Sequence, residues 1–193
     1  MAMTVFLGLC RPITISANSN TSPSPSNSIV EVETTDINTK RWIVTDNGEI
    51  YDLVINYKEH YLKIDDEICP YQVEEIQILT RATIDYSSAR RFESKIPWKG
   101  SVTLLSAAIA GLVSGGSAAG WAATVAGALT ADAENIWLTF TQYDSVESYY
   151  SNYYSTYYKK SINKNIIFYQ NSVSSANIVY GTVQGSWFDP IRP

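Results

Sequence analysis

Hydrophobic and polar residues alternate along residues 40–68, and this alternation predicts three short antiparallel strands. The segments RWIVT and EIYDLVINY flank residues 46–48, where Asn47 and Gly48 supply the positive φ that a tight hairpin turn needs. Turns at 58–60 and 65–67 bound a third strand, YLKI, and a further extended or mixed segment follows at 74–87. One face of the second strand is apolar; its members are Tyr51, Leu53, Ile55 and Tyr57.

A long uncharged run follows, from Gly100 to Ala131. Its large apolar residues recur at helical spacing on both sides of Gly115 and Gly116. Because each glycine weakens a continuous helix by about 1 kcal/mol relative to Ala, two helices joined at this pair are the simpler prediction. One long helix with a kink is the alternative.

The strand pattern returns after Asn135. Four segments rich in β-branched and aromatic residues are separated by Asp, Ser and Asn clusters: IWLTFTQY, YYSNYYSTYYKK, NIIFYQNS and NIVYGTVQGSWF. The order strands, helices, strands predicts an α+β fold. In it an antiparallel β-meander, a central Gly/Ala-rich helical hairpin and C-terminal Tyr-rich antiparallel strands form one domain over residues 40–193.

The N-terminal residues have the order of an export signal. The apolar stretch MAMTVFLGLC is followed by Ala17 and then by the polar run NSNTSPSPSNS. Residues 1–17 are therefore predicted to be a signal segment with a truncated start, since no Lys or Arg precedes the apolar stretch. Residues 18–39 are predicted to be a flexible polar leader. The alternative is an ordinary disordered N-terminus that carries a few apolar residues.

The net charge and the cysteine content restrict the partners and the cellular location that we expect for this chain. The net charge of −5 argues against nucleic acid as a partner, because nucleic-acid binding needs clustered Lys and Arg, and this chain has only the pairs at 90–91 and 159–160. Cleavage after Ala17 would leave Cys69 as the one cysteine, so no internal disulfide would form. A secreted chain without disulfides that is rich in Tyr, Asn, Ser and Ile is typical of a Gram-positive bacterium.

No catalytic, cofactor or metal site is predicted, and the chain is expected not to be an enzyme. Its single histidine, His60, lies in a turn where a solvated side chain is expected. The run at 65–67 lacks the alternate-residue spacing of a calcium loop, and no phosphate-binding or nucleophile motif is present. The enzymatic alternative that stays open is a pair of carboxylates that are distant in sequence and brought together by the fold.

The uncharged segment 101–131 has three interpretations. It is a helical pair buried against a sheet, a single helix that spans a membrane, or an element that is soluble at first and inserts later. Small residues at four-residue spacing, such as Gly111 and Gly115, let helix backbones approach closely, which in lipid favours helix association. The candidate membrane-insertion residues are Leu104, Leu105, Ile109, Leu112, Val113, Gly115, Gly116, Gly120, Trp121, Val125 and Leu129.

Three tyrosine pairs follow at four-residue spacing. The Ser, Asn and Thr residues between them favour a strand with Tyr on both faces over a helical stripe. Tyrosine suits membrane interfaces and carbohydrate- or protein-binding faces, because its ring is apolar and its tip is polar. The structural alternative is a strand with one buried face and hydroxyls that reach water. The candidate interfacial or binding residues are Tyr149, Tyr150, Tyr153, Tyr154, Tyr157 and Tyr158.

The order of export signal, polar leader, IPWKG, uncharged segment and Tyr-rich strands resembles small secreted proteins of Gram-positive bacteria. Over residues 90–170 it resembles the bacteriocin-like proteins of the geobacillin 26 type, in arrangement and composition. This resemblance implies a secreted antibacterial or toxin-like protein. The first hypothesis is therefore a non-enzymatic protein that acts at membranes through its helical hairpin. The alternative is a cell-surface binding module with the hairpin as its core. The partner is a lipid membrane or a cell-envelope component, with self-association as a further option.

Overall fold

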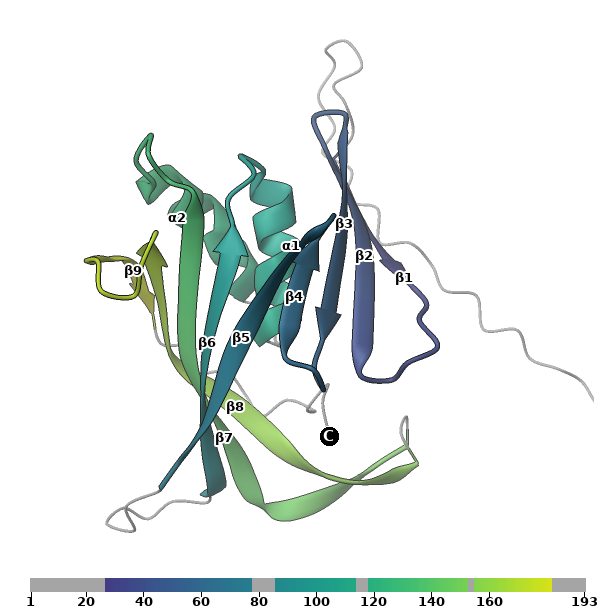
Figure 1. Cartoon of the computed structure of the whole chain (residues 1–193). Coiled ribbons are helices and arrows are strands. Elements are labelled where there is room, and N and C mark those ends of the chain that lie inside the picture. The colour runs from purple at the N-terminus through teal and green to yellow at the C-terminus, as the bar shows by residue number, and fades with distance from the viewer. Residues whose placement is uncertain (1–26, 78–85, 114–117, 153–154, 182–193) are drawn as a thin grey trace, which may run out of the picture.

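Nine antiparallel strands form one sheet in the computed structural model, which describes residues 27–77, 86–113, 118–152 and 155–181 (Figure 1). Every strand pairs with its neighbours in sequence, so the sheet is a meander from β1 to β9. The strands are β1 (Ser28–Val32), β2 (Thr39–Asp46), β3 (Glu49–Asn56), β4 (Tyr61–Ile64), β5 (Glu67–Ile76), β6 (Tyr86–Pro97), β7 (Asn135–Ser151), β8 (Thr156–Gln170) and β9 (Asn177–Gly181).

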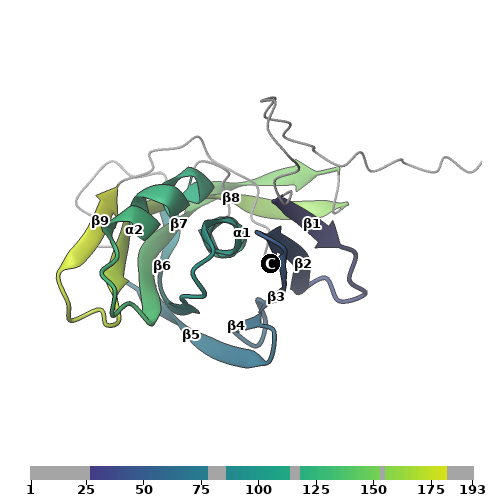
Figure 2. The same ribbon diagram turned by 90° about the horizontal axis from the view of Figure 1, so that it is seen from above.

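Three short helical elements lie between β6 and β7, although these two strands pair directly. They are α1 (Val102–Val113), the 3-10 helix η1 (Ala118–Trp121) and α2 (Ala122–Ala128). The view from above shows the strands curving around α1, which is seen end-on, while α2 lies beside β7 and β9 (Figure 2). The sheet therefore encloses α1 on its concave face.

The predicted α+β fold with a central helical hairpin is wrong, because the described part of the chain is mostly β. The spacing of apolar residues predicted the helical stripe of α1 correctly, but it underestimated the strand content. β6 occupies residues 86–97, for which the sequence predicted no strand beyond residue 87. Its outward residues are charged or polar, which masks the alternation of Phe92 and Ile96 on the buried face. The second helix is only seven residues long, and β1 lies within the predicted polar leader at 18–39.

The predicted first hairpin is present, and its turn lies at the expected residues. Thr45 pairs with Ile50 and Asp46 with Glu49, and the turn residues Asn47 and Gly48 have φ of 52° and 88°. The turn also lies close to the start of α1. Asp46, directly before the turn, is buried, and its carboxylate accepts a hydrogen bond from the Ser101 hydroxyl. Ser101 in turn accepts a bond from the Leu104 amide at 3.0 Å, as a helix N-cap does.

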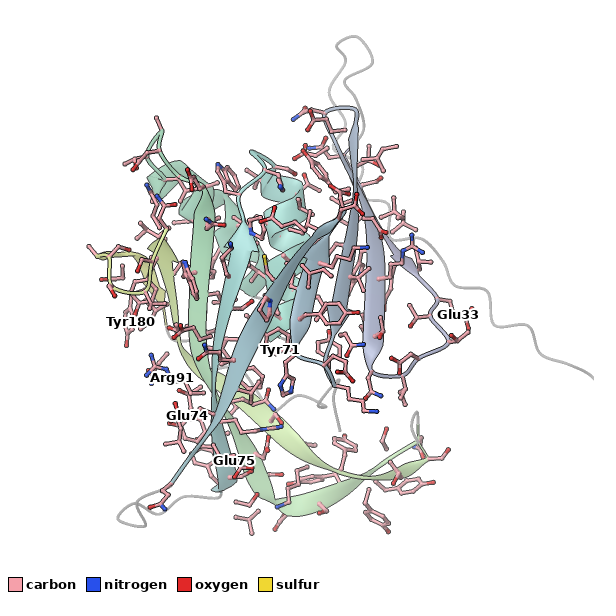
Figure 3. All side chains as sticks on the ribbon, viewed as in Figure 1. Glu33, Tyr71, Glu74, Glu75, Arg91 and Tyr180 are labelled. Carbon is pink, nitrogen blue, oxygen red and sulfur yellow. The ribbon has the colours of Figure 1, made fainter. Side chains whose placement is uncertain are left out.

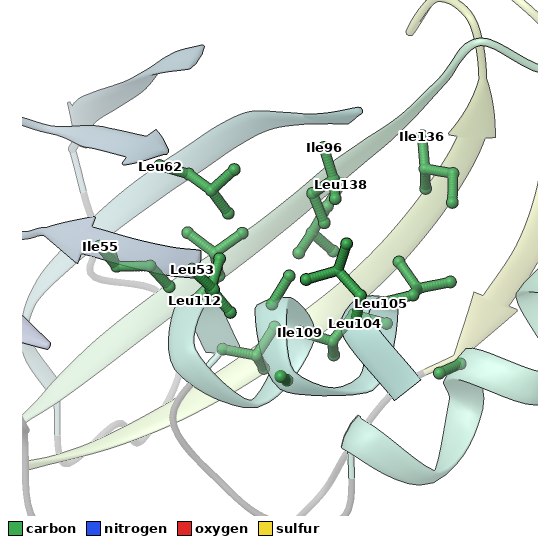
Figure 4. Close-up of a cluster of buried hydrophobic side chains, with 14 of the residues drawn as sticks. Leu53, Ile55, Leu62, Ile96, Leu104, Leu105, Ile109, Leu112, Ile136 and Leu138 are labelled. Atoms are coloured by element: carbon green, nitrogen blue, oxygen red, sulfur yellow. The ribbon is translucent and has the colours of Figure 1, made fainter. Parts of the chain in front are cut away.

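Helix α1 is the centre of the hydrophobic core. Its side chains Leu104, Leu105, Ile109 and Leu112 are buried against strands from both halves of the sheet (Figure 4). A helix that is apolar on nearly all sides is stable in water only when it is surrounded, and the curved sheet with η1 and α2 surrounds it. The sheet side chains drawn with it are Leu53, Ile55, Leu62, Ile96, Ile136 and Leu138.

At Gly111, α1 packs tightly against the sheet. A Cβ at this position would lie 2.5 Å from Ile55 Cδ1 and 2.9 Å from Trp42 Cη2. The Tyr57 hydroxyl donates to the Gly111 carbonyl at 2.9 Å. The small residue that the sequence analysis linked to helix association in lipid thus serves helix–sheet packing.

Gly111→Ala is expected to destabilise the fold, and Gly127→Ala in α2 is its matched control. Overpacking costs about 1–3 kcal/mol, which outweighs the gain of about 1 kcal/mol in helix propensity. Nothing lies within 4 Å of a Cβ at Gly127, so the control should stabilise by about 0.5–1 kcal/mol. Urea unfolding followed by circular dichroism measures both. Equal changes in the two variants would contradict the close packing at Gly111.

Candidate binding surface

β7 and β8 are the longest strands of the described chain, and the far end of their hairpin curves away beneath β1 to β4 in the view of Figure 1. We call residues 145–160 the tyrosine arm. Up to Ser145, β7 also pairs with β6; from Ser148 onward, its partners are in β8 alone. From Ser148 onward the arm is therefore a two-stranded ribbon, with Tyr150 and Tyr157 exposed and Ser151 buried.

The tyrosines of the arm form cross-strand pairs. Tyr149 lies opposite Tyr158 and Tyr150 opposite Tyr157, and because successive residues alternate, the two pairs occupy opposite faces. Tyr150 and Tyr157 are 53% and 70% exposed, and their rings meet edge to face with centroids 5.3 Å apart. Tyr149 and Tyr158 are half-buried. Tyr153 and Tyr154 lie outside the described residues.

Every charged side chain of the arm is engaged by a neighbour. Glu147 accepts a hydrogen bond from the Tyr149 hydroxyl at 3.1 Å. The Lys160 ammonium lies 4.2 Å from the centroid of the same Tyr149 ring, as a cation–π contact. Lys159 donates to the Ser87 hydroxyl of β6 at 2.6 Å. These interactions order the arm, while Glu147 and Lys159 stay exposed beside its rings, hydroxyls and amides.

A buried polar cluster centred on Asp144 anchors the arm to the sheet. One carboxylate oxygen accepts from Ser161 at 2.6 Å and from Gln142 at 3.3 Å; the other accepts from Ser88 at 2.9 Å and from Arg90 at 3.2 Å. The donors come from three strands, β6, β7 and β8. Since β6–β7 and β7–β8 both shift register here, the cluster fixes the point at which the ribbon leaves the sheet.

Sequence reasoning missed this cluster, although a signal was present. Gln142 and Asp144 continue the alternation of Ile136, Leu138 and Phe140, so they fall on the buried face of β7. Two polar residues in register with a core face indicate a buried polar network. In the sequence, Arg90 and Arg91 look like one basic pair, and this hid the ion pair between Arg90 and Asp144. In the structure the two arginines lie on opposite faces of β6.

The two arginines of that pair have separate environments. Arg90 faces Asp144, whereas Arg91 lies opposite Glu74 in the register of β5 and β6 (Figure 3). Glu75 lies opposite Arg90 on the neighbouring position. The pair therefore does not form a basic patch.

The structure places the described insertion candidates mostly in the protein core. Trp121 and Leu129 are partly buried against the core, Gly120 is exposed, and Gly115 and Gly116 lie outside the described residues. In the part of the chain that the structure describes, no helix has the length and apolar character needed to cross a membrane. The fully buried candidates are Leu104, Leu105, Ile109, Leu112, Val113 and Val125.

The described side chains that could act in catalysis or bind a metal ion are not gathered at one place in the fold. His60 is exposed in the turn before β4, with its ring 5.3 Å from that of Tyr71. Cys69 is buried, and desolvation raises the pKa of its thiol, which disfavours the nucleophilic thiolate. Across the described residues, no three His, Cys, Asp or Glu side chains are grouped as a metal ion would require.

Comparison of the chain with family models, with characterised proteins and with solved structures gives no match. The resemblance to bacteriocin-like proteins of the geobacillin 26 type therefore stays a prediction. Functional inference from here rests on the surface itself.

Proposed function

We propose that this protein is a secreted, non-enzymatic binding module that attaches to the cell envelope through the tyrosine arm. The observation that carries the proposal is the exposure of Tyr150 and Tyr157 on a projecting, anchored ribbon. Tyrosine contributes rigid contact area at a low cost in side-chain entropy, which suits it to recognition surfaces.

The composition and anchoring of the arm support this proposal. Between residues 145 and 160 the chain contains mainly Tyr, Ser, Asn and Thr, the side chains that dominate antibody binding loops. The cross-strand pairs and the Asp144 cluster hold the arm before any ligand arrives. A surface that is already ordered loses less entropy on binding, which strengthens affinity.

Burial of α1 favours this function over membrane insertion through the helical segment. Insertion would require Leu105, Ile109 and Leu112 to leave contacts with both halves of the sheet. Burying a large aliphatic side chain contributes about 1.5–3 kcal/mol, so their release would remove most of the stability of a domain of this size. The helical segment is accordingly assigned the role of core.

The double variant Tyr150→Ala/Tyr157→Ala tests the proposal, with Tyr180→Ala as the control. Tyr180 is 59% exposed on β9, outside the arm (Figure 3). The double variant is expected to bind isolated Gram-positive envelopes about tenfold more weakly, since a central aromatic contact is worth roughly 1–2 kcal/mol. The control should bind as the parent chain does. Co-sedimentation of the purified full chain with the envelopes measures the binding.

Dye release from anionic lipid vesicles separates the two hypotheses of the sequence analysis. A binding module should leave the vesicles intact at concentrations that saturate the envelopes. Leakage that survives the double tyrosine variant would reject the proposed function and return the helical segment to the role of insertion element.

A further inference from the structure

Strand β1 forms one edge of the sheet, and its outer side has no strand partner in the described chain (Figure 1). It pairs with β2 alone, from Ser28 to Val32, without a shift in register. In an edge strand, alternate residues direct their backbone N–H and C=O groups away from the sheet, where another strand can pair with them. We infer that β1 pairs with β1 of a second copy of this chain, so that two molecules form a symmetric dimer. This inference is independent of the tyrosine arm.

Few of the features that protect an edge strand from pairing are present in β1. Natural edge strands carry Lys or Pro, or are bent by bulges, whereas β1 has the sequence SIVEV and a regular ladder with β2. Ile29 and Val30 are 45% and 54% exposed, on opposite faces of the strand. The other edge strand of the described sheet, β9, is irregular, because its register with β8 shifts between Phe168 and Tyr169. Of the two edges, β1 is therefore the better template for another strand.

Contacts within the molecule hold β1 in place before a second copy arrives. Just before the strand, Asn27 donates a hydrogen bond to the Thr103 hydroxyl of α1 at 3.3 Å and accepts one from the Asn47 amide at 3.2 Å. Within the strand, its one charged residue, Glu31, forms an ion pair with Lys40 of β2 at 2.9 Å. An edge strand that is already ordered loses little further entropy when another strand is added.

The sequence of β1 is complementary to itself in an antiparallel pair. A two-fold axis at the middle residue, Val30, uses all five residues of the strand and places Val30 opposite its own copy. Glu31 then lies opposite Ile29 of the second molecule, so no two carboxylates of the paired strands face each other. Within each molecule, Val30 lies opposite Ile43 of β2, which is partly exposed. The dimer would therefore join two Val30–Ile43 pairs into one apolar strip across the contact.

The size and the charge of this contact indicate a weak, reversible dimer. Two paired strands of five residues bury much less surface than the standard interface of about 1,600 Å², so the expected dissociation constant is on the order of 0.1 mM. Each molecule has a net charge of −5, so the two copies repel each other at long range. Salt screens this repulsion and should strengthen the dimer, whereas an interface built on ion pairs would weaken in salt.

Sedimentation equilibrium of the full chain measures the association. The weight-average mass should rise from that of the monomer toward twice that value as the protein concentration increases from about 0.01 to 1 mM. Raising NaCl from about 0.05 to 0.5 M should lower the dissociation constant by about twofold or more.

Val30→Lys and Ile50→Lys form a matched pair of variants for this experiment. Both residues lie on the same face of the sheet, at 54% and 69% exposure, but Ile50 is in β3, which has a partner strand on each side. Val30→Lys would place two ammonium groups opposite each other at the two-fold axis and should raise the dissociation constant about fivefold or more. Ile50→Lys makes the same change in net charge and should stay within about twofold of the parent chain. Near-ultraviolet circular dichroism establishes that both variants are folded.

Each alternative contact gives a different result. A parent chain that stays monomeric at every concentration would show that β1 is covered or has another partner, and would overturn the inference, as would equal association by Val30→Lys. Masses above that of the dimer would assign head-to-tail growth between the two edges of the sheet. Loss of association in Tyr150→Ala/Tyr157→Ala would assign the contact to the arm, and weakening by salt would assign ion pairs; each of these results would also overturn the β1 dimer. Envelope binding, which tests the proposed function, is measured separately and does not depend on any of them.

Discussion

Leu112→Asp is expected to unfold the whole protein. Leu112 is 3% exposed and packs in the core that α1 forms with both halves of the sheet. A carboxylate there would have no compensating charge, and the cost of burying it is on the order of 5 kcal/mol, comparable with the whole stability of a small domain. Near-ultraviolet circular dichroism and thermal unfolding of the purified variant measure the loss.

Val102→Asp is the matched control, because it places the same charge on the same helix at a position that is 39% exposed. A carboxylate in the first turn also interacts favourably with the helix dipole, so stability should be unchanged or slightly higher. A folded Leu112→Asp protein would show that α1 is not the core. The helical segment would then be available for insertion.

Asp144→Ala is expected to release the arm and to destabilise the fold by about 2 kcal/mol. The change removes the acceptor shared by Ser88, Arg90, Gln142 and Ser161, and leaves a guanidinium that is largely covered without its partner. Hydrogen exchange should therefore accelerate across residues 145–160 while β2 to β4 stay protected. Envelope binding should weaken in parallel, since the arm would no longer be ordered in advance.

Asp52→Ala provides the comparison for this variant. Asp52 also pairs with an arginine, Arg41, at 2.8 Å, but these side chains are 32% and 44% exposed, more than those of Asp144 and Arg90. Screening by water makes such a pair a minor contributor, so stability, exchange and binding should change far less than in Asp144→Ala. Similar exchange rates in the arm for the two variants would contradict the anchoring role of the Asp144 cluster.

Local features of the sequence predicted local features of the structure. The turn at Asn47 and Gly48 was found because its backbone geometry depends on those two residues. The helical stripe of α1 was found because its spacing is independent of what covers it. The balance of helix and strand was not predicted. The outer face of β6 is charged, and β6 pairs with β7 across a break of about forty residues that no local pattern reveals.

The binding surface shows the same difference between local features, which the sequence predicted, and long-range contacts, which it did not. The tyrosine pairs were found from spacing and composition, but their prediction as a single strand was wrong. The structure places their described members on two paired strands, Tyr149 and Tyr150 in β7 and Tyr157 and Tyr158 in β8. The anchor was missed because its donors are contributed by three strands and converge only when the sheet forms. Alternation along β7 alone would have shown that Gln142 and Asp144 face inward, but not which side chains meet them.

The meander order of the sheet has a consequence for synthesis. A chain that emerges N-terminus first can pair each new strand with the one just completed, from β1 to β6, without waiting for a distant partner. Because pairing of neighbouring strands closes only short loops, these steps carry a low entropic cost. The concave face then holds Leu53, Ile55 and Leu62 uncovered until the next residues appear, and those residues are α1. The uncharged helix thus follows β6 directly and can cover that apolar face before β7 is made.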